Sequence, residues 1–287
     1  MKIGMYANMY DGSYSRWGDE MFKKIKAFGF DAVDFSMGNT ENVPYTLPTT
    51  EDKEAYLLNV KRLAEEADVE ITQTHGPWRW PIRDLEPADR QERMDKMKES
   101  IWATSVLGCK HWVVHPIMPY GVEDIPAGKE QETWDANIEF MGELLKYAKE
   151  LDVTICLENM PFLDFSISTP EQILKFVKTM NDDHFKICFD TGHCNVFADL
   201  SVGDEIRRLG KEIVAFHISD NMWAIDLHLF PYMGSTDWDN FSKSLRDIDY
   251  KGVFSLETRP SENFPTPIFV KMTESLVDIA KDLINKI

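Results

Sequence analysis

Residues Thr154 to Thr191 read TICLENMPFLDFSISTPEQILKFVKTMNDDHFKICFDT, and the hydrophobic pattern changes twice within this stretch. Thr154–Asn159 and Phe185–Thr191 are short runs of apolar and β-branched residues, which are typical of buried strands. Between them, residues 170–181 have the spacing of an amphipathic helix, and Pro170 suits a first helical turn. The stretch therefore predicts a strand–helix–strand unit with parallel strands.

The same alternation continues on both sides of this unit. Further strands are expected at Lys2–Ala7, Asp31–Met37, Glu70–His75, His111–Pro116, Ile213–Ser219 and Gly252–Thr258. Helices are expected between and after them, at 18–29, 52–67, 88–107, 131–150, 201–210, 237–248 and 264–286. Eight such units close a (β/α)8 TIM barrel, whereas the alternative, a doubly wound sheet, would favour a Gly-rich phosphate loop after the first strand, which this sequence lacks. No linker divides the chain, so we expect a single α/β TIM-barrel domain over residues 1–287.

The charge balance and the cysteines restrict the class of protein. The chain has 31 Lys+Arg against 49 Asp+Glu, a formal net charge of −18. Because phosphate backbones are bound through basic faces, we expect no nucleic-acid partner. The four cysteines form no C-x-x-C pair, which fits a reducing compartment. With no signal-peptide pattern and no apolar run near the ~18 residues of a membrane span, we expect a cytoplasmic protein without membrane contact.

Side chains that can bind metals stand at the expected C-terminal ends of six consecutive strands. They are His75, His115, Glu158, Asp190 with His193 close behind, His217 and Glu257. The C-terminal ends are where barrels of this kind carry their chemistry. One such residue alone is more often structural, but six on successive strands favour a shared metal or catalytic site. Their mixture of nitrogen and oxygen donors suits Mn²⁺, Mg²⁺, Zn²⁺ or Co²⁺.

The residues two places earlier share the inward face of each strand, because side chains alternate along a strand. They are Gln73, Val113, Cys156, Cys188, Ala215 and Ser255. These side chains are mostly small and weakly polar, so they predict a packed floor that keeps water away from the carboxylates above it.

The loops at the same end of the barrel carry aromatic residues and one arginine of interest. Trp78 and Arg79 follow the third strand, and Tyr10, Tyr14 and Trp17 follow the first. Flat aromatic rings can stack on sugars, and Arg79 could hold an anionic group. The alternative is that the aromatic side chains simply anchor the loops in the core.

Several motifs together resemble the sugar phosphate isomerase/epimerase family, whose members share a xylose-isomerase-like barrel. The motifs are Leu157-Glu158-Asn159, Phe189-Asp190-Thr191-Gly192-His193, His217-Ile218-Ser219-Asp220-Asn221, and Asp226-Leu227-His228 leading to Gly234 and Asp237-Trp238. The family includes ketose 3-epimerases, inosose dehydratase, hydroxypyruvate isomerase and endonuclease IV. The sequence departs from it at Pro231-Tyr232-Met233-Gly234, where the usual pattern is Pro-Gly-x-Gly. A bulky Tyr232 in place of the first glycine leaves loop shape and substrate fit open.

The resemblance implies a metal site and allows two sizes for it. In ketose 3-epimerases one divalent ion is held by residues that match Glu158, Asp190, His217 and Glu257. In endonuclease IV the site extends to three zinc ions, through residues that match His75, His115, His193, Asp226 and His228. This chain has a compatible side chain at every one of these positions.

The leading hypothesis is a divalent-metal-dependent isomerase or epimerase of a small keto sugar or polyol. Glu158 and Glu257 would be the catalytic residues, moving a proton through an enediolate while the cation acts as a Lewis acid. Substrate contacts are expected from His75, His115, His193, Trp78, Arg79 and His228. By analogy with the family we also expect a homo-oligomer.

Three alternatives stay open at this point. The same site could support a sugar dehydratase or lyase, either inosose dehydratase-like or C-glycoside-cleaving. A three-zinc phosphodiesterase resembling endonuclease IV is disfavoured by the net charge of −18. A non-enzymatic sugar- or partner-binding barrel is disfavoured by the complete ligand set.

Overall fold

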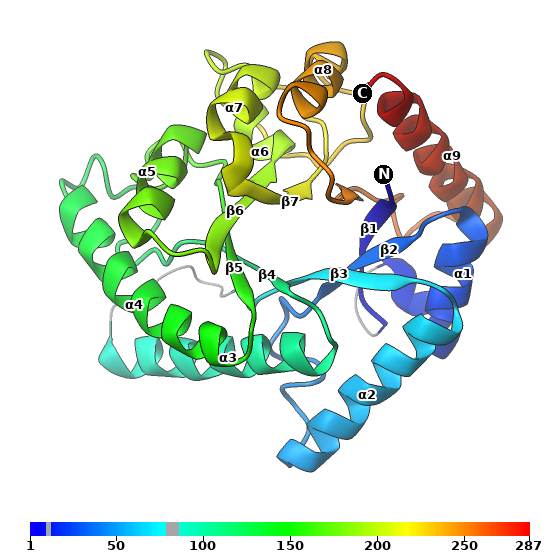
Figure 1. Cartoon of the computed structure of the whole chain (residues 1–287), viewed down its shortest axis with the longest axis horizontal. Helices are drawn as coiled ribbons and strands as arrows, with labels where there is room; N and C mark the ends of the chain where they lie inside the picture. The colour runs from blue at the N-terminus through cyan, green and yellow to red at the C-terminus, as the bar shows by residue number, and fades with distance from the viewer. Residues whose placement is uncertain (10–12, 79–85) are drawn as a thin grey trace.

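Eight parallel strands form a barrel in the computed structural model, which describes residues 1–9, 13–78 and 86–287 (Figure 1). The strands are β1 (Ile3–Ala7), β2 (Ala32–Ser36), β3 (Glu70–His75), β4 (His111–Val114), β5 (Thr154–Glu158), β6 (Phe185–Asp190), β7 (Ile213–His217) and β8 (Phe254–Leu256). Their order is β7-β6-β5-β4-β3-β2-β1-β8. The ring closes just beyond the end of β7, where Ile218 N donates to Ser255 O at 2.9 Å and Glu257 N donates to Ile218 O at 3.0 Å. The predicted (β/α)8 TIM barrel is confirmed.

Helices surround the barrel (Figure 1). They are α1 (Met21–Phe28), α2 (Thr50–Glu66), α3 (Pro87–Val106), α4 (Glu130–Glu150), α5 (Pro170–Met180), α6 (Thr191–Asn195), α7 (Val202–Leu209), α8 (Trp238–Asp247) and α9 (Thr266–Asn285), with 3-10 turns at Ser13–Glu20 and Gly210–Glu212. As expected, Pro170 opens α5, and Thr169 caps it by accepting a hydrogen bond from Gln172 N. Among the helices of the described ranges, none has the length and apolar character needed to cross a bilayer.

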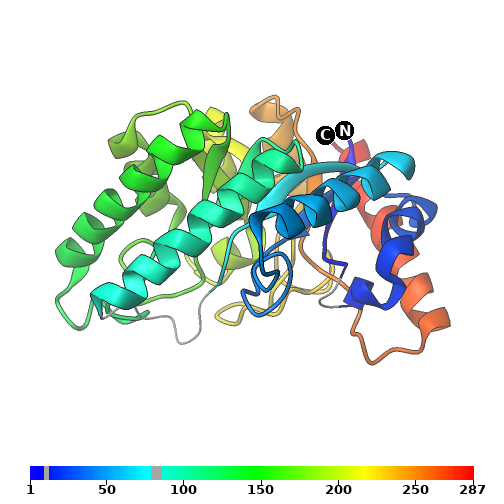
Figure 2. The same cartoon turned by 90° about the horizontal axis from the view of Figure 1, so that it is seen from below.

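The barrel interior has the small-residue floor that the strand pattern predicts. Val113, Cys156, Cys188 and Ala215 form their own fully enclosed cluster, separate from the larger core between the strands and the helices. Because side chains alternate, the residues two places further along these strands point into the barrel mouth above the floor. Figure 2 shows the long loops at one end of the barrel and both chain termini at the other.

Six of the eight strands end one or two residues before their predicted boundaries, and three of these ends bear on the site. β4 stops at Val114 because Pro116 has no N–H to donate to the ladder, so His115 follows the strand rather than ending it. β8 stops at Leu256, so Glu257 also lies just beyond its strand. After β6, the Asp190 side chain accepts a hydrogen bond from His193 N at 2.6 Å and starts the unexpected short helix α6.

Candidate active site

Four of the predicted metal ligands converge at the mouth of the barrel. Glu158 and Asp190 end β5 and β6, His217 ends β7, and Glu257 follows β8. One ligand atom from each lies within 4.8 Å of the other three. Glu158 is 1% exposed, and Asp190 and His217 are 0% exposed. The strand ends therefore assemble the group, which we call the central cluster.

His217 is oriented by a residue that the sequence analysis missed. Its Nε2 lies 2.7 Å from Oδ2 of Asp34, and a carboxylate at this distance accepts the ring's proton. Its Nδ1 then faces Glu158 Oε1 at 2.9 Å and Glu257 Oε2 at 3.2 Å. Asp34 stands in β2, is fully buried, and also accepts a hydrogen bond from Gln73 Nε2 at 2.9 Å. A carboxylate behind an imidazole in this way fixes which ring nitrogen can bind a metal.

Three carboxylate oxygens of the central cluster accept no hydrogen bond within the described structure. Glu158 Oε2, Asp190 Oδ2 and Glu257 Oε2 are buried and have no hydrogen-bond partner among the described residues. Within that part of the chain, every ion pair of these carboxylates is with a histidine. Buried carboxylates must be paired, protonated or metal-bound. Three carboxylates and one imidazole nitrogen fit a divalent cation.

In the central cluster, the pKa values of Glu158 and Asp190 are shifted from their ordinary values in opposite directions. Burial alone would raise the pKa of Glu158, but the His217 and His115 rings lower it well below its usual range. Burial raises the pKa of Asp190 to about 7, against the opposing influence of His193. Glu158 is therefore a carboxylate at neutral pH, whereas Asp190 exchanges its proton near neutrality.

A second group lies beside the central cluster and is formed by His193, Asp226 and His228. Asp226 Oδ2 is 3.3 Å from His193 Nε2 and 3.2 Å from His228 Nε2. Each ring donates its Nδ1 proton to a backbone carbonyl, that of Asn159 at 2.7 Å and that of Glu257 at 3.0 Å. Burial disfavours a charged His228 ring, but the hydrogen bond that the ring donates to Asp226 and the nearby negative charges of Glu257, Asp226 and Asp190 together outweigh burial and raise the pKa of His228 to about 9.

The remaining predicted substrate residues form one wall of the mouth. His75 Nε2 and His115 Nε2 lie 3.4 and 3.1 Å from Glu158 Oε2. The Trp78 ring packs edge-on against His115, with the ring centroids 4.6 Å apart. Arg79 lies outside the described residues, as does Tyr10. The wall thus joins the central cluster to the loop after β3.

The suggestion that Tyr14 and Trp17 stack on substrate is wrong. Their rings pack against Phe269 of α9, with centroid distances of 5.3 and 5.6 Å. They anchor the 3-10 turn Ser13–Glu20 to the outside of the barrel, which was the alternative considered for loop aromatics.

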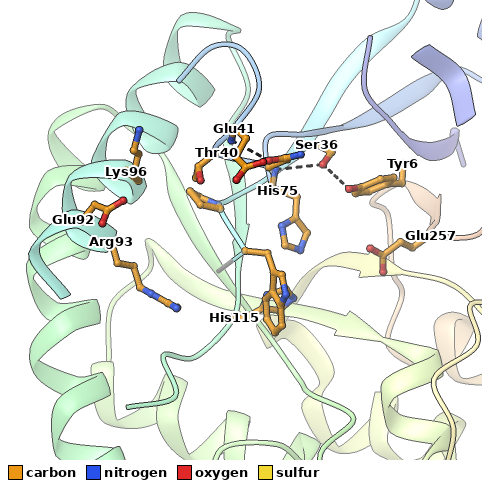
Figure 3. Close-up of a pocket in the computed structure, with 14 residues that line it drawn as sticks. Tyr6, Ser36, Thr40, Glu41, His75, Glu92, Arg93, Lys96, His115 and Glu257 are labelled. Carbon is orange, nitrogen blue, oxygen red and sulfur yellow. Dashed lines mark hydrogen bonds between the residues drawn. The ribbon is translucent and has the colours of Figure 1, made fainter. Parts of the chain in front are cut away.

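The mouth holds two cavities that meet at His75, Trp78, His115 and Glu257. We call the first the inner lobe; it has a volume of about 200 Å³ and borders Glu158, Phe162, His193, Asp226 and His228. We call the second the outer lobe; its volume is about 690 Å³, and it runs from Tyr6 and Ser36 to the loop after β2 and to α3. Figure 3 shows the outer lobe, with Glu257 and Tyr6 on one side and the side chains of α3 on the other.

Contacts of Asp220 and of Tyr232 fix the loop between β7 and α8, which carries Asp226 and His228. Asp220 accepts hydrogen bonds from Gly234 N at 2.8 Å and from Trp238 Nε1 at 2.9 Å. Tyr232 has a left-handed backbone with φ 75°, the conformation that glycine adopts most easily. Its side chain contacts α9 and is not among the described residues that line either lobe.

Comparison with known proteins gives a consistent picture. The model of a family described as xylose isomerase-like TIM barrel matches residues 22–276. A D-psicose 3-epimerase of Enterocloster bolteae is 24% identical over 259 residues, covering 90% of this chain and 82% of the relative. An uncharacterized protein of Methanocaldococcus jannaschii is 30% identical over 211 residues, covering 70% of this chain and 69% of the relative.

Solved structures share the fold over the whole chain. A D-tagatose 3-epimerase-like protein superposes with a TM-score of 0.76 at 24% identity and covers 100% of this chain and 99% of its own. A structure described as IOLI protein with a binding zinc atom has a TM-score of 0.74 at 17% identity, covering 100% and 99%.

Proposed function

The chain belongs to the xylose isomerase-like TIM barrel family, and from this premise we propose that it is a divalent-metal-dependent epimerase or isomerase of a small keto sugar. Its relatives include sugar epimerases and an inosose isomerase. The observation that carries the proposal is the position of Glu158 and Glu257, whose carboxylates approach His217 Nδ1 from two different strands, at 2.9 and 3.2 Å.

Glu158, Asp190, His217 and Glu257 would hold the cation. Their unsatisfied oxygens and the direction of His217 Nδ1 fit a divalent ion. When bound, the cation supplies Lewis-acid stabilisation of the negative charge that develops on the sugar's oxygens. Asp34 holds the His217 ring so that Nδ1 stays available on this side.

The two glutamates would carry the proton transfer. One carboxylate removes the proton from the carbon beside the ketone, and the resulting enediolate keeps the electron pair of the broken C–H bond. The other glutamate, as the acid, returns a proton to the opposite face of that carbon, which gives the epimer. Return to the neighbouring carbon instead gives the isomer. The low pKa of Glu158 keeps this carboxylate ionised at neutral pH, as a base must be.

The histidines and Trp78 would hold the sugar in the inner lobe. His75 and His115 present their Nε2 atoms beside Glu158, and His193 presents its Nε2 beside Asp226, so all three rings could contact the hydroxyls of a bound sugar. Phe162 and Trp78 give the inner lobe apolar walls that exclude water from the reacting carbon.

Glutamine variants of the two glutamates test this assignment. With a panel of keto sugars, Glu158→Gln and Glu257→Gln should each lower turnover by about 10²–10⁴-fold. Deuterium uptake from solvent should disappear from one face of the reacting carbon in each variant, and from a different face in the two. Glu205→Gln is the matched control, because Glu205 is also buried, at 4% exposed, but belongs to α7, and it should leave turnover unchanged. Full activity of both site variants would refute the assignment.

The second group supports one alternative, a three-zinc phosphodiesterase resembling endonuclease IV. His193, Asp226 and His228 bring three ligand atoms within 4.8 Å of one another. Elemental analysis of protein purified without chelator separates the two functions. A metal content near one per chain supports the epimerase, whereas about three zinc ions per chain with cleavage of abasic DNA would support the nuclease.

A further inference from the structure

The outer lobe is larger than the proposed reaction requires. Its volume is about 690 Å³, whereas that of the inner lobe is about 200 Å³. Sites for drug-sized ligands span roughly 300–1,000 Å³, so the inner lobe has the size for one small sugar and the outer lobe for a further group. A water molecule occupies about 30 Å³ in the liquid. If a monosaccharide bound alone in the inner lobe, the outer lobe would therefore still hold on the order of twenty waters.

The two lobes adjoin beside the reacting centre. Both are bordered by His75, Trp78, His115 and Glu257. A ligand that places one ring beside Glu257 can therefore extend past Trp78 into the outer lobe. The flat, amphipathic Trp78 ring at this junction suits contact with a sugar ring.

The far wall of the outer lobe is polar and carries both signs of charge. The loop after β2 contributes Asn39, Thr40 and Glu41, and α3 contributes Glu92, Arg93 and Lys96 (Figure 3). Figure 3 shows Arg93 reaching from α3 toward the side of the lobe on which His115 lies. A phosphate or carboxylate group here would meet two carboxylates as well as two cations. Hydroxyl groups both donate and accept hydrogen bonds, so a polyhydroxyl group matches this mixed wall better.

We propose that the physiological substrate is a glycoside, with the keto sugar in the inner lobe and a second glycosyl unit in the outer lobe. This inference rests on the proposed function, since it takes the reacting sugar to lie beside Glu158 and Glu257. It adds that the loop after β2 and α3 determine specificity for the second unit.

A comparison of D-fructose with isomaltulose, a glucosyl-fructose with a free ketone, tests the inference. The enzyme should convert isomaltulose with a kcat/KM at least about tenfold above that for D-fructose, a difference of roughly 1.4 kcal/mol. Thr40→Trp, which fills part of the outer lobe, should remove this advantage and leave the value for D-fructose within about twofold. Thr179→Trp is the matched control, because Thr179 is exposed on α5, and it should change neither value.

Binding measured by saturation-transfer NMR separates failure of this inference from failure of the proposed function. If neither sugar turns over but Thr40→Trp weakens isomaltulose binding alone, the proposed function fails and the glycosyl site stands. If D-fructose turns over while isomaltulose neither binds nor reacts, the glycosyl site is refuted and the proposed function stands. A preference for fructose phosphate that Thr40→Trp abolishes would show that the outer lobe takes an anion instead, which also overturns the inference.

Discussion

Replacing Asp34 with asparagine should weaken the binding of a divalent cation about ten- to a hundredfold, because residues behind a metal-binding histidine have effects of this size. Asp34 is 0% exposed and accepts the Nε2 proton of His217 at 2.7 Å. An asparagine can present its NH₂ group to Nε2, which then becomes the unprotonated nitrogen. The ring proton moves to Nδ1, where it blocks the side that faces Glu158 and Glu257. At about 1.4 kcal/mol per decade, the loss corresponds to roughly 1.4–2.8 kcal/mol.

The assay is calorimetric titration of chelator-treated protein with Mn²⁺, together with ¹⁵N NMR of the His217 ring to identify the protonated nitrogen. Asp124→Asn is the matched control, because Asp124 is also 0% exposed but accepts its hydrogen bond from Ser166 N at 2.8 Å, away from both lobes. It should leave the Mn²⁺ affinity unchanged. The reasoning is refuted if Asp34→Asn folds, keeps the affinity and still shows His217 with its proton on Nε2.

Three further outcomes follow from the site and its loop. Because burial raises the pKa of Asp190 to about 7, a proton competes with the cation for this carboxylate. The affinity for Mn²⁺ should therefore fall below pH 7 by up to about tenfold per pH unit. An affinity that stays constant from pH 5.5 to 8 would contradict this. His228 should titrate with a pKa of about 9 when followed by NMR. Because this pKa is raised from 6.5, the contribution of His228 to stability is complete below pH 6.5 and is lost as the pH rises through 9. Asp226→Asn should return the pKa of His228 toward 6.5. Gly234→Ala should lower the free energy of unfolding in urea by about 1–3 kcal/mol, because its Cβ would clash with the backbone oxygen of Asn221. The control Gly142→Ala has open space and should stabilise α4 by about 0.5–1 kcal/mol.

The central cluster could be predicted from sequence because it depends only on the ends of parallel strands. Once the alternation predicts a barrel, residues such as Glu158, Asp190 and His217 must meet at one mouth. Asp190 and His217 are indeed direct register partners on neighbouring strands. The prediction needed no knowledge of loops or of side-chain rotamers, which is why it survived errors of a few residues in the strand boundaries.

Asp34 escaped prediction because its role depends on strand register. It lies below the end of β2, and an irregularity at Val33 and Asp34 aligns it with Gln73 of β3. Its partner His217 is 183 positions away in sequence. The available signal was a single acidic residue inside a fully buried strand whose other residues are uncharged. Such a residue must have a partner, although the sequence alone does not name it.

The loop aromatics were harder to predict for a different reason. Tyr14 and Trp17 follow β1, as Trp78 follows β3, and composition alone does not separate them. The contact that decides the role of Tyr14 and Trp17 is with Phe269, at the other end of the chain. Trp78 instead packs on His115 and borders both lobes. Local sequence gives the residue type, whereas the packing of distant helices decides whether the ring faces the core or the ligand.

Tyr232 shows how a departure from a motif can be accommodated outside the site. A left-handed backbone costs a residue with a Cβ about 1–2 kcal/mol, a cost that glycine does not have. Tyr232 adopts that conformation with φ 75°, its hydroxyl donates to Asp282 Oδ2 at 2.7 Å, and Lys286 Nζ donates to the hydroxyl at 2.9 Å. The end of α9 thus helps to hold a loop conformation that glycine would adopt without strain. Because the same loop carries Asp226 and His228, their placement depends on contacts made on the outer surface of the barrel.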